Sequence, residues 1–280
     1  MRQDTTGTET ARRGTVTLAD RRTLAFEVMG AQHPGEPVLL LRPLGGSMPL
    51  WGRFRERLAE RARVIAFDHA GAGESSAAPL LIGTRGRAWD AAELLDELGI
   101  GRAHVFGVSL GGMVATWLAV EFPGRVARLC LASTPPAGLD LSASGLGRGL
   151  SLATCLARPS REVQPCLVRR VLSRAVREGD PGRAGHIAAA AAGQPARRRE
   201  LLKQAAAAML HDARDDLHRV RAPTLVLAGD QDELLGAGPQ RELAAAIPGA
   251  RFELVPEAGH ALTLEQPDRV ADLVAAFFFG

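Results

Sequence analysis

Hydrophobic positions form short, nearly continuous runs, and longer stretches with apolar residues every three or four positions lie between them. The runs lie at 38–41, 63–67, 103–108, 126–131, 223–227 and 251–255. Helical spacing follows at Trp89–Leu98, Gly111–Glu121 and Gln266–Phe278. Strands without polar alternation are typical of a parallel sheet buried on both faces. The pattern predicts an α/β fold, with a mostly parallel central sheet covered by helices on both faces.

The first residues differ from this pattern. Residues 1–13 are polar and mixed in sign, and we expect a disordered tail. Gly14–Leu18 and Thr23–Val28 are predicted to form an opening hairpin. The start carries no apolar stretch behind a positive segment, which disfavours a secretory signal and favours a cytoplasmic protein. No apolar run approaches the ~20 residues that cross a bilayer, so no membrane partner is expected.

A second segment lacks strand patterns altogether. Between Pro135 and Arg221 the chain is rich in Ala, Leu and Arg and has helical spacing with several proline breaks. We therefore predict a helical cap at 137–221, inserted after the sixth strand into a core made of 14–136 and 222–280.

Charge is concentrated in the predicted cap. The whole chain has a net charge of +3, yet residues 141–221 hold 15 Lys and Arg against 7 Asp and Glu. This excess fits a solvated, arginine-rich surface, and it also fits a field that steers an anionic substrate. Nucleic acid is not an expected partner, because this segment has no aromatic side chain to stack on bases.

The number and spacing of the cysteines do not predict a disulfide framework. Cys130, Cys155 and Cys166 are an odd number without a CxxC spacing, which favours reduced thiols over disulfides or a zinc site. Cys130 lies in the apolar run 126–131 and is expected to be a buried structural residue.

The strongest motif is Gly107-Val108-Ser109-Leu110-Gly111, which matches G-x-S-x-G between a predicted strand and a predicted helix. In this context the motif forms a nucleophile elbow, a sharp turn that exposes the serine hydroxyl at the top of the sheet. The alternative is a glycine-rich turn whose serine only caps the helix.

A serine nucleophile needs a base, and a base needs an orienting acid. Among seven histidines, His260 follows the last predicted strand and precedes the last helix, while His69 is the alternative. Asp232 follows the preceding strand, with Asp230 as the runner-up. The order Ser109, Asp232, His260 predicts a catalytic triad of the arrangement found with this elbow.

These motifs together resemble the α/β-hydrolase superfamily from about Gly14 to Phe279. The resemblance rests on the elbow, on the turn Asp68–Ser75 that matches D-x-x-G-x-G-x-S, on the segment Pro223–Asp232 and on Gly259-His260. The stretch Gly107–Met113, and the ending in which Gly259-His260 leads into the last helix, are also similar to the enol-lactonase and small-esterase branches. The resemblance implies an α/β-hydrolase fold and acyl-transfer chemistry without a cofactor or metal.

One position departs from the family. The superfamily usually carries His-Gly after its third strand, where this chain has Arg42-Pro43-Leu44. The resemblance implies that the backbone amides of Leu44 and Leu110 form the oxyanion hole. Arg42 is a candidate for binding a substrate carboxylate or enolate, unless it is a surface or ion-paired residue. Met113 is a further candidate for contact with the substrate.

The main hypothesis is a serine hydrolase, an esterase or lactonase, that cleaves a small-molecule carboxylic ester or lactone through an acyl-serine intermediate. The substrate could be anionic if the cap steers it. One alternative is a lyase, cyclase or C–C bond hydrolase that uses the same triad. Another is a ligand-binding receptor with little turnover.

Overall fold

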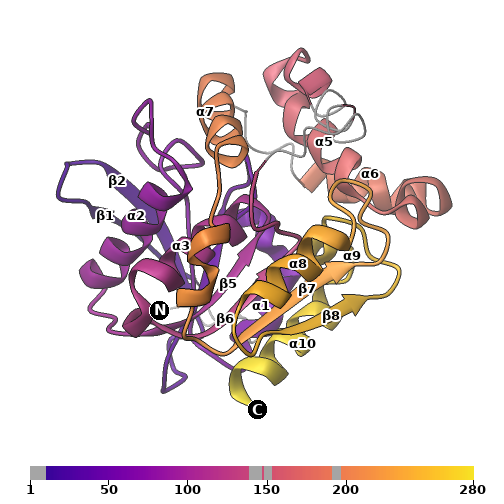
Figure 1. The fold of residues 1–280 in the computed structure, drawn as a ribbon. Coiled ribbons are helices and arrows are strands. Elements are labelled where there is room, and N and C mark those ends of the chain that lie inside the picture. The colour runs from indigo at the N-terminus through magenta and orange to yellow at the C-terminus, as the bar shows by residue number, and fades with distance from the viewer. Residues whose placement is uncertain (1–10, 139–146, 148–152, 191–196) are drawn as a thin grey trace, which may run out of the picture.

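The computed structural model describes residues 11–138, 147, 153–190 and 197–280. Its strands are β1 (Arg12–Thr17), β2 (Thr23–Met29), β3 (Val38–Leu41), β4 (Val64–Phe67), β5 (Ala103–Val108), β6 (Val126–Ala132), β7 (Thr224–Gly229) and β8 (Arg251–Val255). They form one sheet in the order β1-β2-β4-β3-β5-β6-β7-β8 (Figure 1). β2 pairs antiparallel with β1 and β4. All other neighbours are parallel, which confirms the mostly parallel sheet.

Helices cover both faces of this sheet. They are α1 (Gly52–Ala59), α2 (Thr84–Glu97), α3 (Leu110–Glu121), α8 (Gly238–Ala246), α9 (Leu262–Glu265) and α10 (Pro267–Phe279). Buried side chains of α2, α3 and α8 form one apolar cluster, and those of α1, α9 and α10 form a second. Among the helices in the described part of the chain, none has the length and apolar character needed to cross a membrane.

Strand β3 shows why the apolar runs are continuous. Val38 and Leu40 belong to the cluster with α1 and α10, whereas Leu39 and Leu41 belong to the cluster with α2 and α3. Successive side chains of a strand point to opposite faces, so a strand covered on both sides needs apolar residues at every position. Each such burial stabilises the fold by roughly 1.5–3 kcal/mol.

The insertion after β6 is helical, as predicted. It contains α5 (Ser160–Val171), α6 (Pro181–Ala190) and α7 (Arg198–Met209), together with the short helical turns η3 (Ala175–Gly179) and η4 (Arg214–Arg219). Figure 1 shows α5, α6 and α7 together at one end of the molecule, at the top of the view. Residues 139–146, 148–152 and 191–196 of the predicted cap lie outside the described residues.

The first strand begins earlier than its pattern suggested. Arg12 and Arg13 belong to β1 and pair with Val28 and Glu27 of β2. The guanidinium of Arg13 lies 2.7 Å from the buried Glu27 carboxylate, so a charged residue extends the strand through an ion pair. Residues 1–10 of the predicted tail lie outside the described residues.

The expectation of three reduced thiols is wrong. Cys155 and Cys166 form a disulfide with their Cα atoms 5.6 Å apart, a normal separation for such a bond. Cys155 lies in a helical turn at 153–156, and the turn around Pro159 brings it against α5. Cys130 is free and fully buried, as predicted. Burial raises the pKa of its thiol well above the ordinary value, which disfavours the reactive thiolate.

Candidate active site

Ser109 occupies a strained turn between β5 and α3. Its φ of +54° lies in the left-handed region, which residues other than glycine seldom adopt. Two hydrogen bonds hold it there: its amide donates to Ala132 O at 2.9 Å, and Thr134 Oγ1 donates to its carbonyl at 2.8 Å. Its side chain makes no capping bond to the helix, so the hydroxyl is available elsewhere. The geometry is that of a nucleophile elbow.

The two glycines of the motif are required by close packing. A Cβ atom on Gly107 would lie 2.5 Å from the carbonyl oxygen of Gly111 and 2.8 Å from the Cβ of Ala115. A Cβ atom on Gly111 would collide with Leu41 O and would lie 2.7 Å from Arg42 O. The elbow therefore packs directly against the end of β3, where the candidate oxyanion loop begins.

The structure brings Ser109, His260 and Asp232 into one hydrogen-bonded line. His260 Nε2 lies 3.0 Å from Ser109 Oγ, and His260 Nδ1 lies 2.9 Å from Asp232 Oδ2. The tautomer with its proton on Nδ1 satisfies both contacts, because Nδ1 then donates to the carboxylate and Nε2 accepts from the hydroxyl. The loops after β5, β7 and β8 thus bring together the candidates for a nucleophile, an acid and a base at one edge of the sheet.

Asp232 is buried and stays ionised. Burial is the largest influence on its pKa and raises it. The charge and hydrogen bond of His260, and the amides of Leu234 and Leu235 that donate to Oδ1 at 2.9 and 3.0 Å, outweigh burial. The pKa of Asp232 is therefore lower than usual, which suits a carboxylate that holds a charged imidazole.

The runner-up residues are not part of this line. Asp230 is exposed to solvent. His69 is buried, and both of its ring nitrogens lack a hydrogen-bond partner among the described residues. Burial, followed by the charges of Arg42 and Arg87, holds the pKa of His69 well below its ordinary value. His260, which contacts Ser109, is therefore the better candidate for a base than His69.

The two predicted oxyanion donors lie in different segments, Leu110 in the elbow and Leu44 in the loop after β3. Leu110 is the first residue of α3, so its amide is one of those that no carbonyl of the helix can satisfy. Leu44 lies inside a turn in which Gly46 N donates to Pro43 O at 3.2 Å. Within the described residues, the amide of Leu44 makes no hydrogen bond. Both amides stay candidates for holding an oxyanion.

Arg42 is buried, and two of its guanidinium nitrogens have partners in the protein. Its side chain is 1% exposed, and Nε donates to Phe67 O at 2.8 Å. Nη2 lies 3.3 Å from Asp68 Oδ1, so the ion-paired alternative describes it better. Nη1 has no hydrogen-bond partner among the described residues, so contact of Arg42 with a substrate stays a prediction. Met113 is buried in the first turn of α3, and its contact with substrate stays a prediction.

Asp68 is a structural residue whose role the sequence did not reveal. Besides Arg42, its carboxylate accepts the amides of Met48 at 2.9 Å and Glu74 at 2.8 Å. It therefore ties the loop after β3 to the loop after β4. The D-x-x-G-x-G-x-S pattern marked this aspartate, but only the folded chain shows which loop it binds.

The cap contacts the segments after β3, β7 and β8, each of which carries a candidate site group. Arg177 pairs with Glu233 at 2.8 Å, beside Asp232. The amide of Ser173 donates to Glu265 at 3.1 Å, close to His260. Gln204 of α7 accepts the amide of Gly45 at 2.8 Å, beside Leu44. These contacts were not predictable from the cap sequence, which shows only helical spacing.

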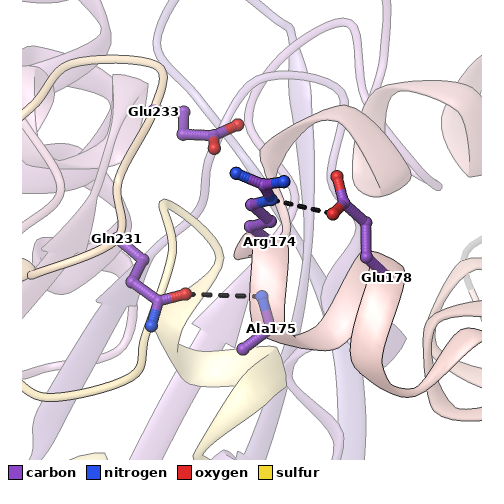
Figure 2. A pocket seen from close by; sticks show the side chains of 5 residues that line it. All are labelled: Arg174, Ala175, Glu178, Gln231 and Glu233. Carbon is purple, nitrogen blue, oxygen red and sulfur yellow. Dashed lines mark hydrogen bonds and ion pairs between the residues drawn. The ribbon is translucent and has the colours of Figure 1, made fainter.

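A pocket of about 520 Å³ lies between the cap and the loop after β7 that carries Asp232. Figure 2 shows that Gln231 and Glu233 face Arg174, Ala175 and Glu178 of the cap across it. Gln231 accepts the amide of Ala175 at 3.4 Å, and Arg174 donates to Glu178 at 2.8 Å. Glu233 pairs with Arg177, which lies outside the lining, and none of the three residues Ser109, Asp232 and His260 lines this pocket.

Ion pairs occur along the described part of the cap, but they leave its basic excess almost unchanged. Six of its described basic side chains have acidic partners: Arg158–Glu162, Arg174–Glu178, Arg177–Glu233, Lys203–Glu200, Arg214–Asp212 and Arg219–Asp216. Five of these acids lie within residues 141–221 and are already counted in the balance of 15 against 7, and only Glu233 comes from outside that segment. Steering of an anionic substrate therefore stays a prediction.

Glu265 joins the loop of His260 to the cap. Its fully buried Oε1 accepts the amides of Gly259 and Ser173, both at 3.1 Å. Burial is the largest influence on the pKa of Glu265 and raises it, although these hydrogen bonds and the charge of Arg183 oppose the change. A group whose pKa is raised on folding stabilises most below its unfolded value, near 4.5, and loses that contribution as pH rises through its folded value.

We expect Glu265→Gln to flatten this part of the pH dependence of stability. The amide oxygen still accepts both N–H groups but no longer ionises, so the variant should gain stability relative to the parent as pH rises above about 4.5. Thermal melting between about pH 4 and pH 8 measures the difference. Glu257→Gln, which removes an exposed carboxylate from the same loop, is the control. Parallel curves for the parent and Glu265→Gln would contradict the expectation.

The fold and the elbow define a protein of the α/β-hydrolase class. Residues 38–273 match the model of the alpha/beta hydrolase family. The chain belongs to this family, and it is therefore a hydrolase.

Relatives and solved structures agree with that assignment. A poly(3-hydroxyalkanoate) depolymerase of Ectopseudomonas oleovorans is 31% identical over 88% of this chain and 87% of its own length. A protein named "Putative carbamate hydrolase RutD" of Azorhizobium caulinodans is 30% identical over 91% and 94%. The structure is similar to a thermophilic esterase of Thermogutta terrifontis, with a TM-score of 0.80, 28% identity and coverage of 95% and 98%.

Proposed function

We propose that this hydrolase cleaves a carboxylic ester or a lactone through an acyl-Ser109 intermediate, without a cofactor. The observation that carries the proposal is the line from Ser109 Oγ to His260 Nε2 at 3.0 Å and from His260 Nδ1 to Asp232 at 2.9 Å. A serine hydroxyl is a weak nucleophile alone, and this arrangement is what activates it. The similarity to a protein named as an esterase supports an ester as substrate.

Acylation would proceed with His260 as general base. Ser109 Oγ attacks the carbonyl carbon while its proton passes to His260 Nε2. Asp232 stabilises the imidazolium that forms, and its low pKa keeps it ionised during the step. The amides of Leu44 and Leu110 would hold the negative oxygen, each donor being worth about 3–4 kcal/mol in a preorganised site.

His260 would act as an acid to complete acylation and as a base again in deacylation. To complete acylation, the protonated His260 gives its proton to the leaving alcohol oxygen, and the acyl group stays on Ser109. A water molecule then gives its proton to His260 and attacks the acyl carbon. The Ser109 oxygen leaves and takes the proton back, so the carboxylic acid is released and the enzyme returns to its starting state.

A substrate panel tests the reaction type. We expect p-nitrophenyl esters or lactones to be hydrolysed, and in ¹⁸O-labelled water one oxygen of the product acid should come from solvent. Carbamates belong in the panel because of the relative named for them. A lyase or cyclase would form product without solvent oxygen, and a receptor would bind ligand without any turnover. Either result would overturn the proposal.

A further inference from the structure

The candidate oxyanion loop contains a tight turn that depends on a glycine. Gly46 N donates to Pro43 O at 3.2 Å, so Leu44 and Gly45 are the two central residues of the turn. Gly45 has a φ of +69°, which favours glycine at the third position of such a turn. The orientation of the Leu44 amide therefore depends on how firmly Gly45 is held.

Two cap glutamines hold Gly45 at both of its backbone polar groups. Gln204 Oε1 of α7 accepts the Gly45 amide at 2.8 Å, and Gln164 Nε2 of α5 donates to the Gly45 carbonyl. An N–H group needs an acceptor and a carbonyl needs a donor, so the orientation of each side-chain amide is fixed by its partner. Two separate cap helices thus contact one residue of the core.

The side chains of both glutamines are buried at this contact. Gln164 is 7% exposed and Gln204 is 2% exposed. A buried polar side chain is costly unless its hydrogen bonds are made, and glutamine is seldom found so deeply buried. The packing is also close, because a Cβ atom on Gly45 would lie 2.7 Å from Leu201 Cδ2 and would collide with Gln164.

We propose that Gln164 and Gln204 are positioning residues that hold the Leu44 amide in place for the oxyanion. This inference rests on the proposed function, in which that amide stabilises the transition state. The cap would then act on the rate of the chemical step, and not only on access to the site. Preorganised donors are effective because they need not reorient during the reaction.

The competing role is simple attachment of the cap. The Arg177–Glu233 and Glu265–Ser173 contacts also fasten the cap, and they touch no predicted oxyanion donor. If the glutamines only attach the cap, their loss should raise KM and lower stability while kcat is kept. If they position the amide, kcat should fall with KM little changed, since the interaction acts in the transition state.

Methionine and glutamate substitutions separate these roles. Gln164→Met and Gln204→Met keep the length of the side chain without its hydrogen bonds, and each should lower kcat about 10- to 100-fold for a p-nitrophenyl ester. Gln204→Glu keeps an acceptor for the Gly45 amide and should restore kcat to within about threefold. Leu202→Glu, an exposed carboxylate on the same helix, is the control.

Gln164→Glu tests the opposite direction of hydrogen bonding, because Gln164 donates to Gly45 whereas Gln204 accepts from it. At about pH 8.5 its ionised carboxylate cannot donate to the Gly45 carbonyl, so no rescue is expected. Equal rescue by glutamate at both positions would contradict the assigned directions of the hydrogen bonds. Unchanged kcat in both methionine variants, or a change confined to KM, would overturn the positioning role.

Two further measurements separate a failure of the positioning role from a failure to fold and from a failure of the proposed function. If the methionine variants do not fold, hydrogen exchange at the Gly45 amide in Gln204→Glu decides, with parental protection expected and loss of protection contradicting the contact. With a p-nitrophenyl ester that acylates the enzyme faster than the acyl group is hydrolysed, the parent enzyme should also show a burst of p-nitrophenol that depends on Ser109. Failure of that burst overturns the proposed function, whereas a normal burst with unaffected glutamine variants overturns the positioning role alone.

Discussion

Ser109→Ala is expected to lower kcat for a p-nitrophenyl ester by about 10⁴- to 10⁶-fold. The substitution removes the only nucleophile that His260 contacts in the described site, at 3.0 Å. Alanine keeps the backbone of the turn, so the melting temperature and KM should change little. Steady-state kinetics with thermal melting measure both effects.

Ser133 offers a matched control for this variant. It is another buried serine with a positive φ, +46°, at the end of the neighbouring strand β6. Its hydroxyl has no hydrogen-bond partner among the described residues. Ser133→Ala should keep kcat within about threefold of the parent. If Ser109→Ala retained a tenth of the activity or more, the nucleophile would have to be another group.

Asp232→Asn is expected to lower kcat about 10⁴-fold with little change in stability. The side chain would still accept the amides of Leu234 and Leu235, so the loop should keep its shape. An amide N–H facing Nδ1 would favour the wrong imidazole tautomer, and the neutral group would no longer stabilise the imidazolium. Pre-steady-state acylation rates measure the loss directly.

The runner-up acid supplies the control for that experiment. Asp230 lies two residues earlier and is exposed, so Asp230→Asn should leave the acylation rate nearly unchanged. The reverse outcome, with Asp230→Asn slow and Asp232→Asn fast, would show that the acid assignment is wrong. Equally small effects of both substitutions on the acylation rate would show that neither aspartate assists His260.

The parallel core was predictable because burial on both faces leaves a direct mark on the sequence. Val38–Leu41 is apolar at every position because its side chains enter two clusters in turn. The disulfide was not predictable, since the contact between Cys155 and Cys166 depends on how one cap turn packs on α5. The early start of β1 depends on an ion pair with Glu27, which no hydrophobic pattern records.

The candidate site also contains residues that the sequence predicted and residues that it could not predict. Ser109, Asp232 and His260 follow strand ends in a recognisable order, and that order predicted which loops would meet. Arg42 was weighed as a substrate ligand, whereas its buried contacts are with Phe67 O and Asp68. Gln164 and Gln204 carried no signal, because a glutamine within a helical stretch acquires its role only from the residue it touches.

Peptide mapping by mass spectrometry after rapid quenching tests the central claim most directly. During turnover of a slowly deacylated p-nitrophenyl ester, the peptide that contains Ser109 should gain the mass of the acyl group, and Ser109→Ala should gain none. Turnover without any acylated peptide, or an acyl group on another residue, would contradict the assignment of Ser109 as the nucleophile.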